Sequence, residues 1–171
     1  MIALLLLLSF ISLCSSIDTV SDLKVEPYLG TWYQVYSGPY NKIIQGKGRC
    51  TTAEYGLLEE NKISVLNSQI DSNNQLNTIG GYAYAKNESD LAKLTVKLDG
   101  VPSEAPYWVV AIGPIEKKIY QYSVVSEPNT IFMWVLARNV EDFFENYDED
   151  VQEYLKSNNF KSVKTDQTNC D

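Results

Sequence analysis

The sequence predicts an all-β fold, an eight-stranded antiparallel up-and-down β-barrel with one C-terminal α-helix. Three observations lead to this prediction: the chain contains eight short β-rich runs, a turn signal follows each run, and helical spacing occurs only once, near the C-terminus. In runs 62–65 and 93–98 apolar residues alternate with polar ones, so each run has one apolar face. The length of 171 residues suits one domain with a sizeable core.

Evenly spaced strands without intervening helices favour an antiparallel barrel or a sandwich. Immunoglobulin-like sandwiches usually have seven or nine strands and no late helix, whereas an eight-stranded barrel has an interior that holds one small ligand. We therefore prefer the barrel. The predicted strands are 31–37, 51–58, 62–70, 76–86, 91–98, 107–113, 119–126 and 130–138, separated by turn residues at 38–39, 59–61, 72–74, 87–90, 99–100, 113–114 and 127–129.

The predicted helix follows the last barrel strand. Asp148–Asp150 form an acidic start that suits the positive N-terminal end of a helix dipole. Val151, Tyr154 and Leu155 then recur at helical spacing, and Ser157–Asn159 supply the stop. No other segment is predicted to be helical. A short strand from Phe160 to Lys164 precedes the C-terminal tail.

Residues 1–16 have the pattern of a secretory signal peptide. They carry no charged side chain, and an apolar run too short to span a bilayer is followed by small residues. We expect cleavage after Ser16, which leaves 17–171 as one secreted, extracellular domain. A bacterial lipoprotein acylated at Cys14 is the alternative, and the bulky Leu13 disfavours it. No other apolar run approaches the length of a transmembrane helix.

Composition excludes several classes of function. The formal net charge of −8 argues against nucleic acid and anionic lipid surfaces as partners. The chain has no histidine, which removes His-dependent catalysis and His-based metal sites. The acidic segment from Glu141 to Glu153 lacks the pattern of a calcium loop and is interpreted as a solvated loop and helix face. We therefore expect neither an enzyme, nor a metal site, nor a cofactor.

Removal of the signal peptide leaves two cysteines, Cys50 and Cys170. An even count in an oxidising compartment indicates one disulfide, with two free buried thiols as the alternative. A disulfide would leave no thiolate for nucleophilic catalysis.

Two motif positions connect the first and last barrel strands. Gly30-Thr31-Trp32 opens the first strand, and Arg138 ends the last one. This pair resembles the signature of the lipocalin family. The resemblance implies that Arg138 lies over Trp32 and closes the barrel floor, a guanidinium stacked on an indole face. Gly30, Trp32 and Arg138 are therefore expected to be structural.

Longer stretches are similar to the apolipoprotein D-like lipocalins, a group close to the bacterial lipocalin lipoproteins. They are 28–33, 48–50, 105–108, 134–138 and 165–170, in the family's order. The resemblance covers nearly all of 17–171 and implies that Cys50 pairs with Cys170. The family's second motif, Thr-Asp-Tyr, is replaced by Ile112-Gly113-Pro114. This departure argues against receptor recognition of the usual kind, although Gly-Pro still turns the chain.

The resemblance also implies that Tyr55, Asn67, Trp108 and Trp134 line a ligand cavity, with core packing as the alternative for each. Strand parity gives further expectations, provided that no bulge intervenes. Leu136 and Trp134 share the face of Arg138, and Gln34 and Tyr36 share that of Trp32. Trp108 likewise shares a face with Val110 and Ile112.

The run 80–85 alternates small residues with tyrosines, and the sequence does not decide which set faces the interior. Small residues pointing inward would make room for a ligand, and tyrosines pointing inward would fill the barrel.

The sequence thus predicts a secreted carrier or scavenger of a small lipophilic molecule, such as a fatty acid, sterol, isoprenoid or tetrapyrrole. The usual site design, an apolar pocket with a few polar groups, fits this function. A protein-interaction module without a ligand and a membrane-tethered lipoprotein are the alternatives. We expect a monomer, with at most transient contact with membranes or lipoprotein particles. Asn87-Glu88-Ser89 is an N-glycosylation sequon in a predicted surface turn.

Overall fold

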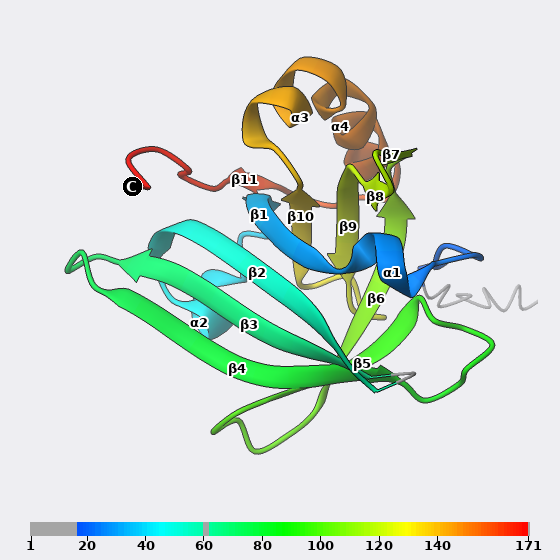
Figure 1. Ribbon diagram of the computed structural model, residues 1–171. Coiled ribbons are helices and arrows are strands. Elements are labelled where there is room, and N and C mark those ends of the chain that lie inside the picture. The colour runs from blue at the N-terminus through cyan, green and yellow to red at the C-terminus, as the bar shows by residue number, and fades with distance from the viewer. Residues whose placement is uncertain (1–16, 60–61, 171) are drawn as a thin grey trace, which may run out of the picture.

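The computed structural model describes residues 17–59 and 62–170, and it shows a closed antiparallel β-barrel (Figure 1). Each barrel strand pairs with the next one, and the last returns to pair with the first. The eight strands are β1 (Gly30–Ser37), β2 (Gly48–Glu59), β3 (Lys62–Asp71), β4 (Leu76–Ala85), β5 (Lys93–Leu98), β6 (Ala105–Ile112), β9 (Tyr122–Ser126) and β10 (Met133–Ala137). The predicted fold class is confirmed. Residues 60–61 of one predicted turn and the predicted signal peptide lie outside the described residues.

Further short elements join the barrel. The strand β11 (Val163–Lys164) pairs with the end of β1, close to the predicted position. A small hairpin of β7 (Ile115–Glu116) and β8 (Ile119–Tyr120) precedes β9, so the predicted strand 119–126 is interrupted at Gln121. Within the described ranges, no helix is long and apolar enough to cross a membrane.

The prediction of a single helix was wrong. The expected helix is present as α4 (Asp148–Ser157), but α3 (Val140–Asn146) precedes it, and α1 (Val25–Tyr28) and α2 (Lys42–Gln45) are single turns. Asn139 caps α3 by accepting a hydrogen bond from the backbone N–H of Asp142. Val140, Phe143, Phe144 and Tyr147 have the helical spacing that marks this helix, within the stretch that was interpreted as a solvated loop.

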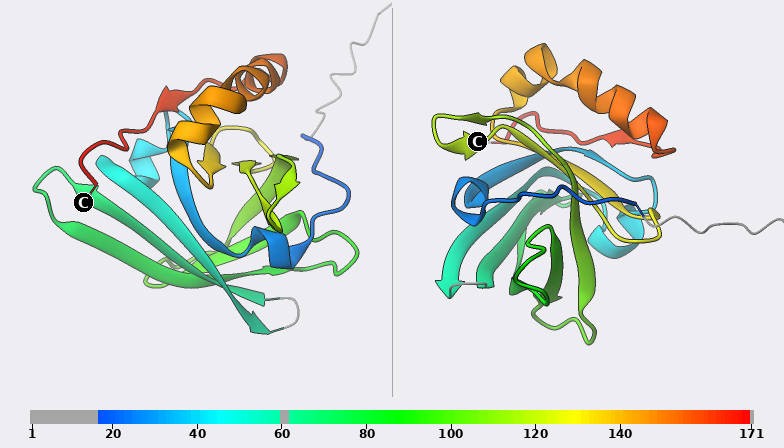
Figure 2. Two further views of the ribbon diagram at one scale, coloured as in Figure 1. Left: turned by 45° about the horizontal axis from the view of Figure 1, so that its top comes forward. Right: turned by 90° about the vertical axis from the view of Figure 1, so that its right-hand side faces the viewer.

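The two ends of the barrel differ. At one end α1 packs next to β8 and closes the barrel floor. The turns 72–75 and 99–104, the loop 127–132 and the segment 38–47 with α2 surround the opposite, open end. Helices α3 and α4 lie outside the barrel, against the wall formed by β1, β9 and β10 (Figure 2).

Apolar side chains form two clusters on opposite faces of the sheet. The inner cluster fills the closed half of the barrel, and the outer cluster joins the barrel wall to α3 and α4. The inner cluster consists of Leu23, Tyr28, Trp32, Ala53, Tyr55, Ile63, Val65, Ala83, Ala85, Ala92, Leu94, Val109, Tyr120, Val125 and Leu136. The outer cluster consists of Val35, Val110, Val124, Met133, Val135, Ala137, Phe143, Val151, Leu155 and Phe160.

Two β-bulges change the face parity that simple alternation predicts. A bulge between Gln34 and Tyr36 turns Tyr36 outward, where its hydroxyl donates to Asp148 on α4 at 3.0 Å. A second bulge between Val109 and Ala111 separates Val110, in the outer cluster, from Ile112, which packs against the inner cluster. The predictions that Tyr36 points inward and that Val110 and Ile112 share a face were therefore wrong.

The floor is sealed by Arg138 over Trp32, as the family resemblance implies. The guanidinium carbon lies 3.8 Å from the centre of the indole, and Trp32 is fully buried. Arg138 also donates to the carbonyls of Tyr120, Thr31, Pro27 and Leu29, at 2.7–3.2 Å. Gly30 lies beneath it with φ +93°, and this left-handed conformation explains glycine in the motif.

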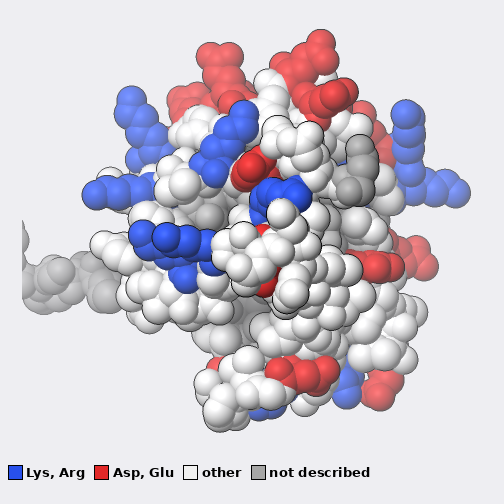
Figure 3. All heavy atoms as spheres, turned by 90° about the vertical axis from the view of Figure 1, so that its left-hand side faces the viewer, with Lys and Arg blue, Asp and Glu red and all other residues white. Residues whose placement is uncertain are grey.

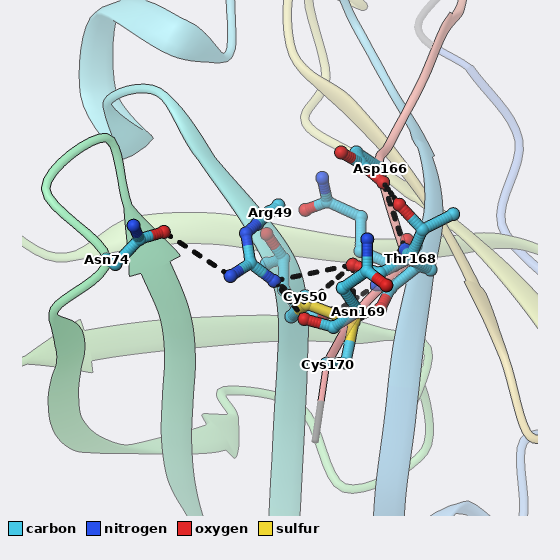
Figure 4. The surroundings of a disulfide bond; sticks show 10 residues. Arg49, Cys50, Asn74, Asp166, Thr168, Asn169 and Cys170 are labelled. Carbon is cyan, nitrogen blue, oxygen red and sulfur yellow. Dashed lines mark hydrogen bonds between the residues drawn. A yellow bond between two sulfur atoms is a disulfide. The ribbon is translucent and has the colours of Figure 1, made fainter.

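A disulfide between Cys50 and Cys170 ties the C-terminal tail to the start of β2 (Figure 4). The Arg49 guanidinium donates to the carbonyls of Thr168 and Asn169 beside it. The sequence separation of 120 corresponds to about 4–5 kcal/mol in the chain-entropy account of disulfides. The pairing implied by the resemblance is confirmed.

We predict that Arg138→Ala lowers the free energy of unfolding by roughly 2–4 kcal/mol, because it uncovers Trp32 and leaves carbonyls without donors. Urea denaturation measures the change. Lys93→Ala is the matched control: its ammonium lies 5.3 Å from the Trp108 ring on the surface, and its loss should cost about 1 kcal/mol or less. Equal effects of the two substitutions would contradict the role given to Arg138.

Candidate ligand-binding site

Strand β4 leaves space inside the barrel. Ala83 and Ala85 belong to the inner cluster, whereas Tyr82 and Tyr84 point outward. The ammonium of Lys62 lies 4.3 Å from the Tyr82 ring centre, and the Tyr84 hydroxyl donates to Glu104 at 3.1 Å. The register left open by the sequence is therefore the one with small residues inside.

Gly81 continues the small inward row of β4 toward the open end. A Cβ at this position would collide with the carbonyl oxygen of Lys97, so β4 and β5 approach each other more closely than any other residue allows. A larger residue at this position would force β4 and β5 apart, so the backbone itself requires glycine here.

The open half of the interior is accessible to solvent. Three half-buried side chains pack against the inner cluster on the side of the open end: Val96, Leu98 and Trp134. Asn67 shares the face of Ile63 and Val65 and is also half-buried. Figure 3 views the side that carries the turn 72–75 and α2, where uncharged atoms occupy most of the middle and charged side chains stand around them.

Polar groups in the open half are held by Gln45 of α2. Its side-chain oxygen accepts from the Trp134 indole N–H at 3.1 Å, and its amide donates to the Gln34 side chain at 2.9 Å. The Gln69 amide donates to the Gln45 carbonyl at 2.8 Å. These bonds orient the Trp134 ring, and they hold α2 against the rim of the barrel.

Hydroxyl groups form a chain at the base of this space. Tyr107 lies within 2.8 Å of Tyr55 and 2.9 Å of Tyr28, measured between hydroxyl oxygens. The Tyr28 hydroxyl in turn lies 3.0 Å from that of Ser123. The Tyr28 and Tyr55 rings stack with centres 5.6 Å apart, and Trp32 donates to the Tyr28 carbonyl at 2.8 Å. The chain therefore rests directly on the motif that seals the floor.

Burial keeps these tyrosines neutral. Desolvation raises the pKa of Tyr28 to about 12, and it also raises the pKa values of Tyr55 and Tyr107 above the ordinary value. Burial lowers the pKa of Arg138 to about 10, so its guanidinium remains charged at neutral pH. The hydroxyl chain therefore offers neutral hydrogen-bonding groups to the interior.

Below the chain, a small apolar pocket lies at the closed end. Side chains from the N-terminal segment and from β3, β4 and β5 line it, and Tyr28 forms one wall. The lining residues are Leu23, Val25, Tyr28, Leu29, Ile63, Ala83, Ala85, Leu91 and Leu94.

Three of the four predicted cavity residues point inward: Tyr55 at the base, and Asn67 and Trp134 in the open half. Trp108 does not. It packs against the outer cluster, under the ammonium of Lys93. Its neighbour Tyr107 points inward instead. In this part of β6, Tyr107 and Val109 face the interior, so the inward face is the opposite of the one assumed for Trp108.

Sequence reasoning missed Tyr28, Tyr107 and Gln45. Tyr28 lies two residues before Gly30 of the floor motif, and Tyr107 alternates with Val109 on the inward face of β6. The inward direction of both side chains could therefore have been predicted from their positions in the sequence. Gln45 ends the single-turn helix α2, and no pattern in the sequence indicated that its side chain turns into the barrel.

A family model described as "Lipocalin-like domain" matches residues 23–164. The chain is a lipocalin. Apolipoprotein D of Macaca fascicularis is 36% identical over 169 residues, covering 92% of this chain and 84% of that protein. The resemblance to apolipoprotein D-like lipocalins is thereby confirmed.

Solved lipocalin structures show the same fold. The cockroach allergen Per a 4 superposes with a TM-score of 0.64 at 21% identity, covering 90% of this chain and 95% of that one. The amine-binding protein of Rhodnius prolixus, in complex with tryptamine, gives a TM-score of 0.52 at 24% identity, covering 84% and 77%.

We predict that the free energy of unfolding falls between pH 10 and 12 as the unfolded chain loses tyrosine protons that folded Tyr28 retains. The raised folded pKa means that this stability is complete below pH 10 and lost by about pH 12. Tyr28→Phe should reduce the fall by about 2 kcal/mol in urea titrations. Tyr40→Phe, which removes an exposed hydroxyl, should leave the fall unchanged. If the free energy of unfolding falls equally with pH in the native protein, Tyr28→Phe and Tyr40→Phe, the raised pKa of Tyr28 is not its cause.

Proposed function

We propose that this lipocalin binds a small lipophilic molecule in the open half of its barrel and carries it unchanged. The supporting observation is the inward row of small residues on β4, Gly81, Ala83 and Ala85, which keeps tyrosine side chains out of the interior. Half-buried Val96, Leu98 and Trp134 supply an apolar wall, and Asn67 supplies a polar group. Burial of apolar ligand surface at about 25 cal/mol per Å² drives such binding.

Carriage without catalysis agrees with the side chains present. The sequence contains no histidine, and Cys50 and Cys170 are joined. The interior tyrosines are protonated at neutral pH, and burial raises their pKa values still further from it. No described residue of the site therefore offers an activated base or nucleophile.

Similar proteins support a carrier. The Rhodnius prolixus protein holds tryptamine, a small aromatic amine, on the same fold. The name of the Macaca relative describes a protein component of lipoproteins. For this chain the apolar side chains of the inner cluster and the neutral hydroxyls at its base favour neutral lipophiles such as sterols or isoprenoids over amines.

We further propose a secreted, extracellular monomer that makes transient contact with membranes or lipoprotein particles. The side chains of Ile43 and Ile44 on α2 are 73% and 61% exposed, and Ile131 is 52% exposed, all at the open end. Exposed apolar side chains at the mouth suit uptake from a lipid surface. A barrel that serves only protein interaction remains the second candidate, and ligand titration separates the two.

We predict that N-phenyl-1-naphthylamine, a neutral fluorescent lipophile, quenches the tryptophan emission of the native protein by energy transfer. Trp134→Phe should weaken binding three- to tenfold, about 1 kcal/mol, because the indole forms part of the wall. Fluorescence titration measures both the quenching and the affinity.

Trp108→Phe is the matched control, since that ring lies on the outer face. Its affinity should stay within about twofold of native, a difference below 0.5 kcal/mol. Loss of binding in Trp108→Phe but not in Trp134→Phe would reverse the assignment of the two faces. Failure of the native protein to bind this probe or any other lipophile would favour the interaction module.

We predict that expression in a eukaryotic secretory host gives a mature chain beginning at Ile17 and a glycan on Asn87. Asn87 is exposed, and its side-chain oxygen accepts from the Ser89 N–H at 3.1 Å and hydroxyl at 2.8 Å. Intact mass before and after N-glycosidase treatment tests both expectations, and Asn87→Gln should abolish the shift. Expression in a bacterial host that exports and acylates lipoproteins tests the tethered alternative, which a lipid mass on an N-terminal Cys14 would support.

A further inference from the structure

We propose that the hydroxyl chain at the base of the barrel is a selective donor for an uncharged oxygen at the leading end of the ligand, with Tyr107 making the contact. The ligand class would be a lipophile that ends in a ketone, aldehyde, ester or alcohol oxygen. This inference rests on the proposed carrier function and adds the chemical group that the site recognises.

Counting hydrogens shows why the chain has a donor to spare. The hydroxyls of Ser123, Tyr28, Tyr107 and Tyr55 carry one hydrogen each, and three contacts link them in a row. These contacts are their only hydrogen bonds within the described part of the chain. Three bonds use three hydrogens, so one hydrogen is always left without an acceptor.

Each of the three contacts can run in either direction, and one arrangement presents the spare hydrogen on Tyr107. When Ser123 donates to Tyr28, and Tyr28 and Tyr55 both donate to Tyr107, the Tyr107 hydroxyl has both lone pairs occupied. Its own hydrogen is then free, and a ligand atom can meet it only as an acceptor. Tyr107 is also the half-buried member of the chain, whereas Tyr28 and Tyr55 are 2% and 4% exposed.

The surroundings determine that the acceptor is neutral. Arg138 stacks on the Trp32 indole, and it directs N–H groups to backbone carbonyls rather than to the hydroxyl chain. It therefore cannot pair with a carboxylate at the base. An ionised carboxylate buried there would lose its hydration without a counter-ion, which costs several kcal/mol. A neutral carbonyl or hydroxyl oxygen loses far less and gains the Tyr107 hydrogen bond.

Two ligands of matched shape test this inference. In 2-methyl-1-dodecene a CH₂ group replaces the carbonyl oxygen of 2-dodecanone, and the rest of the molecule is unchanged. Dissociation constants come from displacement of N-phenyl-1-naphthylamine from the native disulfide-bonded protein, from Tyr107→Phe and from Tyr84→Phe. The measured quantity is the ratio of ketone to alkene affinity in each protein, which cancels general effects on folding or pocket volume.

We expect Tyr107→Phe to shift this ratio against the ketone by about tenfold. Tyr84→Phe, which loses an outward hydroxyl, should keep the native ratio. Should Tyr107→Phe fold poorly, the native protein gives a second test, because the proposed donor requires the native protein to bind 2-dodecanone more tightly than 2-methyl-1-dodecene. A ketone that binds no more tightly than the alkene would overturn the inference.

An unchanged ratio in Tyr107→Phe, with both ligands still bound, would overturn the inference and leave the carrier function standing. Absence of binding of the probe and of both ligands to the native protein would overturn the carrier function itself. The two failures are therefore distinguishable in one set of titrations.

Discussion

The stack of Arg138 on Trp32 joins the two strands at which the barrel closes, and the other features of the interior follow from it. Trp32 near the start of β1 and Arg138 after β10 meet across the β1–β10 pairing. Their contact fixes which face of each strand points inward, so Gln34 and Trp134 reach the open half and Leu136 packs the base. The four carbonyls bound by the guanidinium hold the floor segment beneath the hydroxyl chain.

The interior is divided into a packed base and an open half. Apolar side chains and neutral hydroxyls fill the base, where any ion would be costly to desolvate. Above it lie the half-buried side chains of Val96, Leu98 and Trp134, and glutamines hold the rim in place. For the proposed ligand, affinity would therefore come mainly from apolar contact, and a few hydrogen bonds would set its orientation.

The strands were predictable because alternation and turn residues are local signals, and the floor motif because its residues are distinctive. Side-chain direction was harder to predict. The bulges at 34–36 and 109–111 reverse parity without any mark in the sequence, so Tyr36 and Val110 were assigned to the wrong face. Trp108 was assigned to the cavity from the family resemblance, whereas in the structure Tyr107 has the inward position and Trp108 packs against the outer cluster. The chain of hydroxyls was beyond reach because its members come from α1, β2, β6 and β9.

The disulfide has a practical consequence for anyone producing this protein. The tail that it anchors also donates from Gln167 to the backbone of Gln34 and Thr51, at the rim of the barrel beside the mouth. Without the covalent link, only such weak contacts would hold that edge. Synthesis in a reducing bacterial cytosol would therefore yield material with a loosened rim and misleadingly poor affinity. Periplasmic export or oxidative refolding is the appropriate source for any measurement.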